Sequence, residues 1–239
     1  ERLRAAGVEV EIGPGGAESR ELNIGFFSRM IRGTPWVRMK AASSLDGVTA
    51  LHNGQSQWIT SAAARADGHA WRARACTILT GIGTVLEDNP RMNVRDVDTP
   101  RQPRIAVVDS KLDMPLNAHV LKASSGCFIY TCSTNQSKIE QLQALGATVI
   151  AIPNAYGKVD LPAMLRDLGT RGTNELHVEA GFKLNGSFLR EGLVDELLLY
   201  MAPRLLGTGS MGLASFGPLE QLSHAISLQM HDVSRVGED

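Results

Sequence analysis

The sequence predicts an α/β protein with a largely parallel sheet, and two observations lead to that prediction. Short apolar runs of β-type composition recur along the 239-residue chain, and segments with helical spacing separate most of them. This alternation favours parallel pairing, because each connection crosses one face of the sheet before the next strand begins. The hydrophobic content of 43% is sufficient for a sizeable core at this length.

The expected strands are the runs richest in β-branched, aromatic and aliphatic residues. They cover residues 36–42, 76–81, 104–109, 127–131, 147–152, 175–180 and 195–203. The stretch AISLQMHDV near the C-terminus follows the last of these runs without a clear helix between them. The C-terminal strands are therefore predicted to be antiparallel.

Helical spacing is expected between the strands, with polar and glycine residues at the helix ends. The expected helices cover residues 60–75, 134–146, 159–169 and 182–192. Thr60 is predicted to cap the first of them, and Gly146 and Gly169 to end the second and third, because these residue types satisfy free backbone groups at helix termini.

The first residues differ in composition from the rest of the chain. ERLRAAGVEVEIG reads as a helix end and a strand, and a Gly- and Pro-containing stretch follows it. Such a stub before an autonomous α/β pattern is typical of the tail of a preceding domain with its linker. We expect residues 1–21 to be this tail and residues 22–239 to be the folded domain.

The charge and cysteine content favour a small molecule as the partner of this chain. A net charge of −1 gives no electrostatic reason to expect nucleic acid or an anionic membrane. No apolar run approaches the roughly 18 residues that cross a bilayer, and the charged N-terminus is unlike a signal peptide, so a cytoplasmic protein is expected. The three cysteines form no C-x-x-C pair and are interpreted as structural.

Two short patterns resemble known motifs and lack the context that would support them. GTGSMG at 207–212 fits G-x-G-x-x-G, but it opens no helix, so a flexible loop is the favoured interpretation. HVE at 177–179 fits the H-x-E of zinc deaminases, whose chemistry also requires P-C-x-x-C downstream. No cysteine follows Cys132, so no metal site is predicted and His177 is interpreted as an ordinary strand residue.

Two other stretches are candidates for binding phosphate. Glu179-Ala180-Gly181 ends a strand and leads into a helix N-terminus, where free N–H groups and the helix dipole favour an anion; the alternative is that Gly181 only turns the chain. In ILTGIGTVLEDNPRMNVR, a turn at 88–90 presents Arg91 and Arg95, which are expected to form a cationic pocket with Arg72 and Arg74. Each arginine taken singly has the alternative of a solvated surface position.

Three stretches together carry a family resemblance. KAASSLDGVTALHNGQSQWIT (40–60), ILTGIGTVLEDNPRMNVR (78–95) and VEAGFKLNGSFLREGLVDELLLYMAPRLLG (178–207) resemble, in this order, the reductase domain of the bifunctional riboflavin-biosynthesis deaminase/reductase. The resemblance runs from about Leu22 to the C-terminus, and the stub before it is similar to the end of the N-terminal zinc deaminase domain of that family. Two positions depart from the family pattern: Ala180 stands where many relatives have Gly, and Met92 where Leu is frequent.

The resemblance implies a dihydrofolate-reductase-like fold, NADPH as cofactor, and zinc only in the deaminase domain. The implied reaction reduces the ribosyl group of 5-amino-6-(5-phosphoribosylamino)uracil to give the 5-phosphoribitylamino compound, in a homodimer. The implied substrate contacts are Lys40, Ser56, Arg72, Met92, Arg95 and Glu179. The implied NADP contacts are Ala42, Trp58, Thr84, Asp88, Ser110, Gly181, Phe182, Lys183, Leu184, Asn185, Gly186 and Ser187.

Within this set, particular roles are expected for the small residues 41–44, for Trp58 and for Glu179. The small residues would let the nicotinamide end lie close to the backbone, and Trp58 would form a wall of the cofactor site; the alternative is a Trp packed on its own loop. Glu179 is the candidate catalytic residue, because it is placed to orient the substrate. Two alternative functions are left open. The chain could be a noncatalytic binding or dimerisation module, or a reductase for another pterin-like or pyrimidine substrate.

Overall fold

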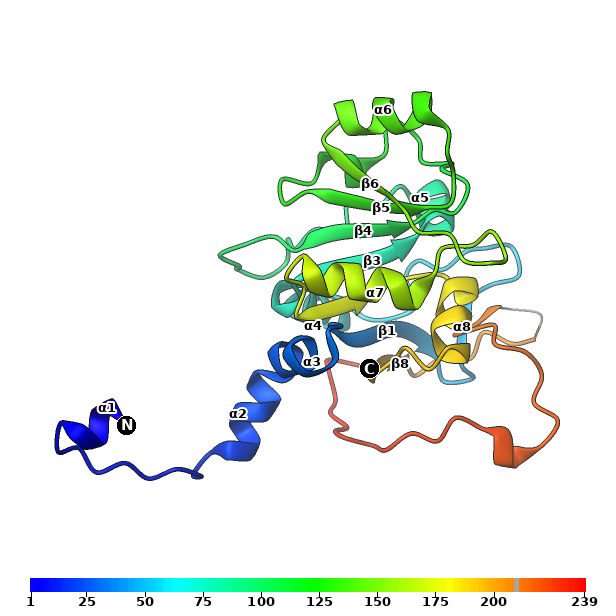
Figure 1. The fold of residues 1–239 in the computed structure, drawn as a ribbon. Helices are drawn as coiled ribbons and strands as arrows, with labels where there is room; N and C mark the ends of the chain where they lie inside the picture. The colour runs from blue at the N-terminus through cyan, green and yellow to red at the C-terminus, as the bar shows by residue number, and fades with distance from the viewer. Residues whose placement is uncertain (209–210) are drawn as a thin grey trace.

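The computed structural model, described for residues 1–208 and 211–239, is built around one seven-stranded sheet in the order β6-β5-β4-β3-β7-β1-β8. Every neighbouring pair in this sheet is parallel. Figure 1 shows the strands running side by side, with β6 and β8 at the two edges. The predicted fold class is therefore confirmed.

The seven strands of this sheet begin and end close to their predicted limits, whereas the short strands β2 and β9 are not among the predicted ones. They are β1 (Trp36–Ser44), β2 (Val48–Ala50), β3 (Thr77–Gly81), β4 (Arg104–Val108), β5 (Cys127–Thr131), β6 (Ala147–Ala151), β7 (Glu175–Val178), β8 (Glu196–Ala202) and β9 (Met211–Gly212). The prediction for the C-terminal strands is wrong for β8, which pairs with β1 in parallel. Antiparallel pairing joins β9 to β2 in a separate small sheet, and residues 225–233 form no strand.

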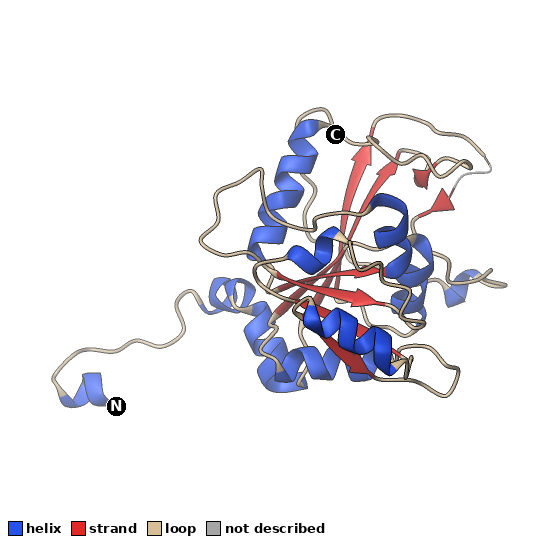
Figure 2. Cartoon of the chain, turned by 90° about the horizontal axis from the view of Figure 1, so that it is seen from above, coloured by secondary structure: helices blue, strands red, loops and turns tan. Residues whose placement is uncertain are grey.

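The helices cover both faces of the sheet, as Figure 2 shows from above. They are α1 (Arg2–Ala5), α2 (Gly16–Leu22), α3 (Ile24–Arg32), α4 (Ala62–Arg74), α5 (Ile82–Asp88), α6 (Gln136–Ala144), α7 (Leu161–Thr170) and α8 (Phe182–Arg190), with the short 3-10 turns η1 (His119–Lys122) and η2 (Leu222–His224).

Two of the predicted helix ends are displaced. The side chain of Ser61, not Thr60, caps α4 by accepting from the N–H of Ala64. Gly169 lies inside α7, where an added Cβ would come within 2.2 Å of the carbonyl oxygen of Gly33. Gly169 is therefore a point of close backbone approach, while Gly146 follows the end of α6 with φ of +87°.

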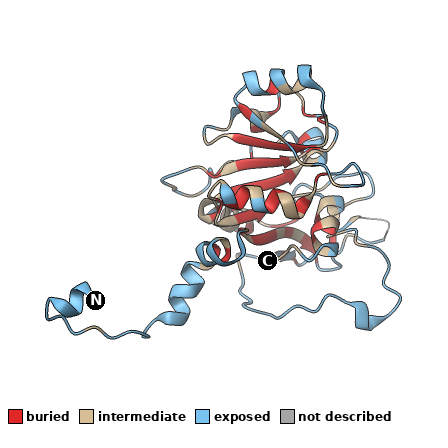
Figure 3. Ribbon diagram, viewed as in Figure 1, coloured by how far each residue is buried: buried red, intermediate tan, exposed pale blue. Residues whose placement is uncertain are grey.

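Two apolar clusters hold the layers together, one on each face of the sheet. On one face, side chains from β1, β3, β5 and β7 pack against α7 and α8. On the other face, side chains from β3, β4 and β5 pack against α5, α6 and η1. Figure 3 shows the strands as the buried layer, while the first 22 residues and the C-terminal segment are exposed. No helix in the described residues has the length and apolar character needed to cross a membrane.

Candidate active site

The topology places the candidate site where the chain leaves β3 and β7. These strands are neighbours, yet the chain leaves β3 through α5 towards β4 on one face and leaves β7 through α8 towards β8 on the other. Connections that diverge in this way open a crevice at the carboxyl ends of the strands, which is where α/β sheets bind ligands. A Cβ added at Gly181, after β7, would lie 4.0 Å from Oγ1 of Thr84 in α5, so the two loops line one opening.

A bidentate ion pair between Arg72 and Glu179 lies at the entrance to this crevice. Nε and Nη2 of Arg72, on α4, donate to the two carboxylate oxygens of Glu179 at 2.5 and 2.8 Å. Nη1 of the same guanidinium donates to the carbonyl oxygen of Asn93 at 3.1 Å. Both side chains of the pair are about 15% exposed. The orientation of the Glu179 carboxylate is thus fixed from one side.

Glu179 is held in its ionised form. Burial alone would raise the pKa of this carboxyl, but the charge and hydrogen bonds of Arg72, together with His177 and the charge of Lys40, lower the pKa well below its usual range. Nε2 of His177, a fully buried residue of β7, lies 3.3 Å from Oε1 of Glu179. We call Lys40, Arg72, His177 and Glu179 the site cluster.

His69 connects α4 to the loop that follows α5. Its Nδ1 accepts from the backbone N–H of Arg95 at 3.4 Å, and its Nε2 lies 3.1 Å from Oδ2 of Asp96. Burial, followed by the charges of Arg72 and Arg95, lowers the pKa of His69 to about 4. His69 is therefore neutral at pH 7 and fixes the backbone beside Arg95, whose side chain is exposed.

The four arginines expected to form one cationic pocket do not converge. Arg72 is engaged by Glu179, whereas Arg74 pairs with Glu175 at 2.8 Å, near the opposite end of β7. Arg91 lines a separate cavity, and Arg95 remains beside the site. The prediction fails because Arg72 and Arg74, two positions apart on a helix, point in different directions.

A second ionic group lies on the same face of the sheet, at the amino ends of the strands. We call its members the support cluster: Arg38, Arg74, Glu175 and Glu196. Arg38 is 1% exposed and donates to Glu175 and Glu196 at 2.9 and 2.8 Å. Its guanidinium also lies 4.3 Å from the centre of the Trp71 ring. Arg38 and Lys40 share this face because alternate residues of a strand do so.

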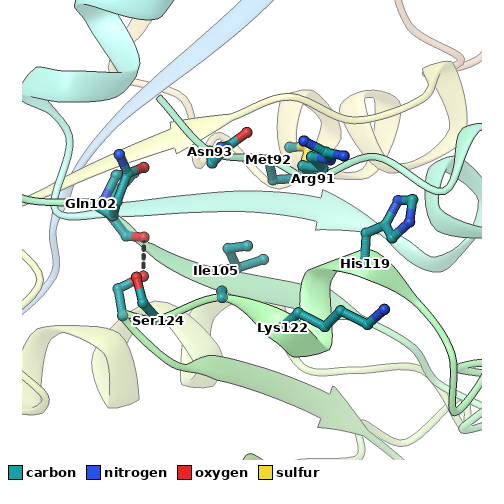
Figure 4. Close-up of a pocket in the computed structure, with 11 residues that line it drawn as sticks. Arg91, Met92, Asn93, Gln102, Ile105, His119, Lys122 and Ser124 are labelled. Atoms are coloured by element: carbon teal, nitrogen blue, oxygen red, sulfur yellow. Dashed lines mark hydrogen bonds between the residues drawn. The ribbon is translucent and has the colours of Figure 1, made fainter. Parts of the chain in front are cut away.

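The side chain of Met92 points away from the site cluster. Met92 is 3% exposed, has φ of +52° and belongs to the apolar cluster around β4. Figure 4 shows Met92 at a cavity together with Arg91, His119 and Lys122. The volume of this cavity is about 410 Å³. A contact between Met92 and a substrate would therefore come from its backbone, and the residue remains a predicted contact.

The start of α8 has the properties expected of a phosphate site. Gly181 precedes the helix without a side-chain cap, and in the described residues no acceptor is present for the N–H groups of Phe182 and Lys183. Free N–H groups and the positive end of the helix dipole favour an anion at this point. The cofactor contact expected at this helix start stays a prediction.

The rest of the predicted stretch 181–187 divides into exposed and buried positions. Asn185 and Gly186 are buried against the segment that follows β9; Nδ2 of Asn185 donates to the carbonyl oxygen of Leu213, and a Cβ at Gly186 would come within 1.9 Å of the carbonyl oxygen of Ser215. Leu184 packs beside the core. These contacts support the loop, and the cofactor contacts of Asn185 and Gly186 stay predictions.

A second cavity continues from this helix. Its volume is about 510 Å³, and Ser110, Lys183, Leu184 and Ser187 from the predicted cofactor set line it together with residues 154–161. Ser110 follows β4 at the carboxyl end of the sheet. The structure thus brings predicted cofactor residues from β4 and α8 to one hollow.

The remaining predicted residues lie around the same edge of the sheet. Ala42 is near the end of β1, and Asp46 makes the predicted turn by accepting from the N–H groups of Leu206 and Gly207. Ser44 and then Gly207 lower the pKa of Asp46 to about 2 through their hydrogen bonds. Ser56 is half-buried on the following loop, and Asp88 ends α5 with an exposed side chain.

Trp58 lies at the surface of its loop. Its side chain is 60% exposed, and the guanidinium of Arg65 lies 4.6 Å from the ring centre. The ring is therefore not buried, and packing on its own loop stays the alternative to contact with a cofactor. Contact with a cofactor stays a prediction.

Sequence reasoning missed several residues that shape this site: His69, Asn93, Asp67, Tyr200 and Lys158. The spacing of His69 and Arg72, three apart on one helix, was a usable signal, because such residues share a face. Asp67 accepts from the hydroxyl of Tyr200 at 2.5 Å, across 133 positions of sequence, and no local pattern marks that pair.

Comparison with known proteins identifies the family of this chain. The family model described as RibD C-terminal domain matches residues 35–239. The riboflavin biosynthesis protein RibD of Escherichia coli is 38% identical over the whole of this chain, and that of Aquifex aeolicus is 33% identical. The chain spans 67% and 65% of the lengths of these two relatives.

Solved structures give the same result. Acinetobacter baumannii RibD superimposes with a TM-score of 0.86 and 33% identity, covering 99% of this chain and 65% of that one. The deaminase/5-amino-6-(5-phosphoribosylamino)uracil reductase of Thermotoga maritima gives 0.78 and 25%, covering 97% and 63%. The chain therefore belongs to the RibD C-terminal domain family, the reductase part of riboflavin biosynthesis enzymes, whose membership implies a nicotinamide cofactor.

Proposed function

We propose that this domain reduces the ribosyl group of 5-amino-6-(5-phosphoribosylamino)uracil to the ribityl group, with NADPH as the reductant. The observation that carries the proposal is the position of Glu179. This ionised carboxylate is three residues before Phe182, where the free N–H groups of α8 begin, so a substrate sugar and a cofactor phosphate have adjacent binding groups. NADPH, when bound, would supply hydride to C1′ of the sugar.

The residues of the site cluster bind and orient in this proposal. Glu179 accepts hydrogen bonds from sugar hydroxyls, because its lowered pKa leaves it without a proton at neutral pH. Arg72 positions Glu179, since three of its N–H groups are already engaged by protein oxygens. Glu179 therefore does not supply the proton that the sugar oxygen needs as the ring opens. Lys40, the cation near it, is the proposed source or relay.

Arg95 is the proposed partner of the substrate 5′-phosphate. Its side chain is exposed beside the site, and its hydrogen bond to Oδ1 of Asn93 is long, at 3.4 Å. Arg95→Ala should lower kcat/KM by roughly 30-fold with the phosphorylated substrate. With the dephosphorylated substrate, the variant and the wild type should be nearly equal; an equal loss with both substrates would exclude phosphate binding by Arg95.

The wider biochemistry is also proposed by analogy. The Thermotoga relative is named as both deaminase and reductase, so we propose that the parent chain also deaminates the preceding pyrimidine, with zinc in that domain. The same proposal makes residues 1–21 the tail of such a deaminase domain. It also includes a homodimeric assembly and a cytoplasmic location.

The decisive experiment follows NADPH oxidation with the aminouracil ribotide as substrate. Turnover that requires this substrate supports the proposal. NADPH oxidation only with another pyrimidine or pterin would make the protein a different reductase. NADPH binding without turnover of any substrate would indicate a binding module.

A further inference from the structure

A hairpin lines the second cavity, and its side chains have no role in the reaction described so far. The hairpin spans residues 153–159 between β6 and α7, and it faces α8 across the cavity. Glu179 lies three residues before the start of α8, and Lys183, Leu184 and Ser187 of α8 line the same cavity as the hairpin. An extended dinucleotide with its hydride end at Glu179 and its pyrophosphate at α8 would place its far end at this hairpin.

The backbone of the hairpin is firmly braced. Pro153 and Val159 form an antiparallel bridge, and the N–H of Asn154 donates to the carbonyl oxygen of Lys158 at 2.7 Å. The side-chain oxygen of Asn154 accepts from the N–H groups of Tyr156 and Lys158 at 2.9 and 3.0 Å. The backbone positions of Tyr156 and Lys158 are therefore set before any ligand binds.

The hairpin places the ammonium group of Lys158 and the ring of Tyr156 at the cavity, near the hydroxyl of Ser110. Lys158 and Lys183 line the cavity, and no carboxylate in the described part of the chain is within ion-pair distance of either. Oγ of Ser110 accepts from the N–H of Val159 at 3.3 Å, which leaves its own proton available to donate. The ring of Tyr156 is 88% exposed.

The charge of the cavity lining is positive overall. Lys158, Lys183 and Arg190 contribute three cations, against the carboxylate of Glu191. Arg190 is occupied by the carbonyl oxygen of Ser215 and by Ser187. Lys158 and Lys183 are therefore the cations available for a ligand. A phosphate monoester beside an aromatic base suits this combination, because lysine pairs with phosphate oxygens and a ring stacks on a base.

We propose that the hairpin makes the domain selective for NADPH over NADH. Lys158, with Ser110 and Lys183, binds the 2′-phosphate of the adenosine ribose, and Tyr156 packs on the adenine. The inference rests on the proposed function, because it places the cofactor by the position of Glu179. It also assigns separate roles to two residues: Lys158 distinguishes NADPH from NADH, and Tyr156 contributes to the binding of both.

Binding measurements without turnover test this division. NADPH and NADH are titrated by nicotinamide fluorescence, and 2′,5′-ADP by calorimetry, against wild type, Lys158→Ala and Tyr156→Ala. Lys158→Ala should weaken NADPH and 2′,5′-ADP at least 10-fold and NADH less than threefold. Tyr156→Ala should weaken NADPH and NADH by similar factors. Lys122→Ala, an exposed lysine of the other cavity, serves as the matched control and should change neither.

The outcomes separate this inference from the proposed function. A wild-type protein that binds neither dinucleotide overturns the proposed reductase itself. Equal affinity for NADPH and NADH, or equal losses for both in Lys158→Ala, leaves the reductase in place and overturns the role of the hairpin. Because both substituted side chains are exposed, the variants should fold, and a melting curve for each checks this.

Discussion

The support cluster and the site cluster lie on one face of the same sheet, yet they differ in how completely their charges are paired. In the support cluster, Arg38 is 1% exposed and has a carboxylate on each side and a Trp ring over it. In the site cluster, Glu179 has one firm partner, Arg72, while both ring nitrogens of the buried His177 lack well-aligned hydrogen bonds within residues 1–208 and 211–239. A closed cluster stabilises a fold, and an incompletely paired one retains capacity for a ligand.

The largest expected effect is on stability, at the support cluster. Arg38→Ala leaves two partly buried carboxylates without their shared cation, and breaking a buried pair from one side costs about 3 to 5 kcal/mol. The free energy of unfolding in urea should fall by that amount, while NADPH affinity per folded molecule should not change. Arg32→Ala is the control, because its pair with Asp195 is half-exposed and should contribute less than 1 kcal/mol. Similar losses in the two variants would contradict the comparison.

The next effect is on activity, at the site cluster. Glu179→Gln keeps the shape of the side chain and removes the charge that accepts from the substrate, so kcat/KM should fall about 100-fold, or about 3 kcal/mol of transition-state stabilisation. Stability should fall less than in Arg38→Ala, because Arg72 keeps the carbonyl of Asn93. Steady-state kinetics and urea unfolding on the same preparation test both parts. An unchanged kcat/KM would remove Glu179 from the mechanism.

A pH dependence of stability should also arise near the site cluster. His69 has a folded-state pKa of about 4, below its unfolded value near 6.5. Between these pH values the unfolded chain binds a proton that the folded chain does not, so acidification from pH 6.5 to 4 destabilises the fold, by at most about 1.4 kcal/mol per pH unit. His69→Gln should flatten this slope in chemical denaturation. An unchanged slope would mean that other groups cause it.

The difference between the two clusters also marks how far the sequence is informative. The seven strands of the large sheet and four of the helices follow from local patterns, and their limits are correct to within one or two residues in most cases. The order of the strands does not follow, because β7 inserts between β1 and β3 through contacts distant in sequence. The pair of Arg72 with Glu179 depends on that insertion and joins residues 107 positions apart.

The error at the C-terminal strands has a related physical cause. The alternation in AISLQMHDV fits a strand, but a strand needs a partner edge, and the described residues place this segment away from one. The residue pattern of β8 does not indicate whether the strand pairs in parallel or antiparallel. Its direction is decided by the crossover through α8, which makes β8 parallel to β1. The family resemblance identified candidate site residues that no local pattern would have assigned, whereas Lys158 lies outside its motifs.

The smallest expected effect concerns Trp58, which belongs to neither cluster. Its ring is 60% exposed, and one face is already covered by Arg65, so contact with a cofactor would use the remaining face only. Trp58→Ala should therefore weaken NADPH binding by about 1 kcal/mol, close to fivefold, and should change the free energy of unfolding of the cofactor-free protein by less than 0.5 kcal/mol. Fluorescence titration and urea unfolding measure the two quantities. Arg65→Ala, which removes the cation beside the ring, is the companion variant. If the Trp58 ring touches the cofactor, this variant should change NADPH affinity by less than Trp58→Ala does. If the ring serves only its own loop, both variants should lower the free energy of unfolding and leave the NADPH affinity of the folded protein unchanged.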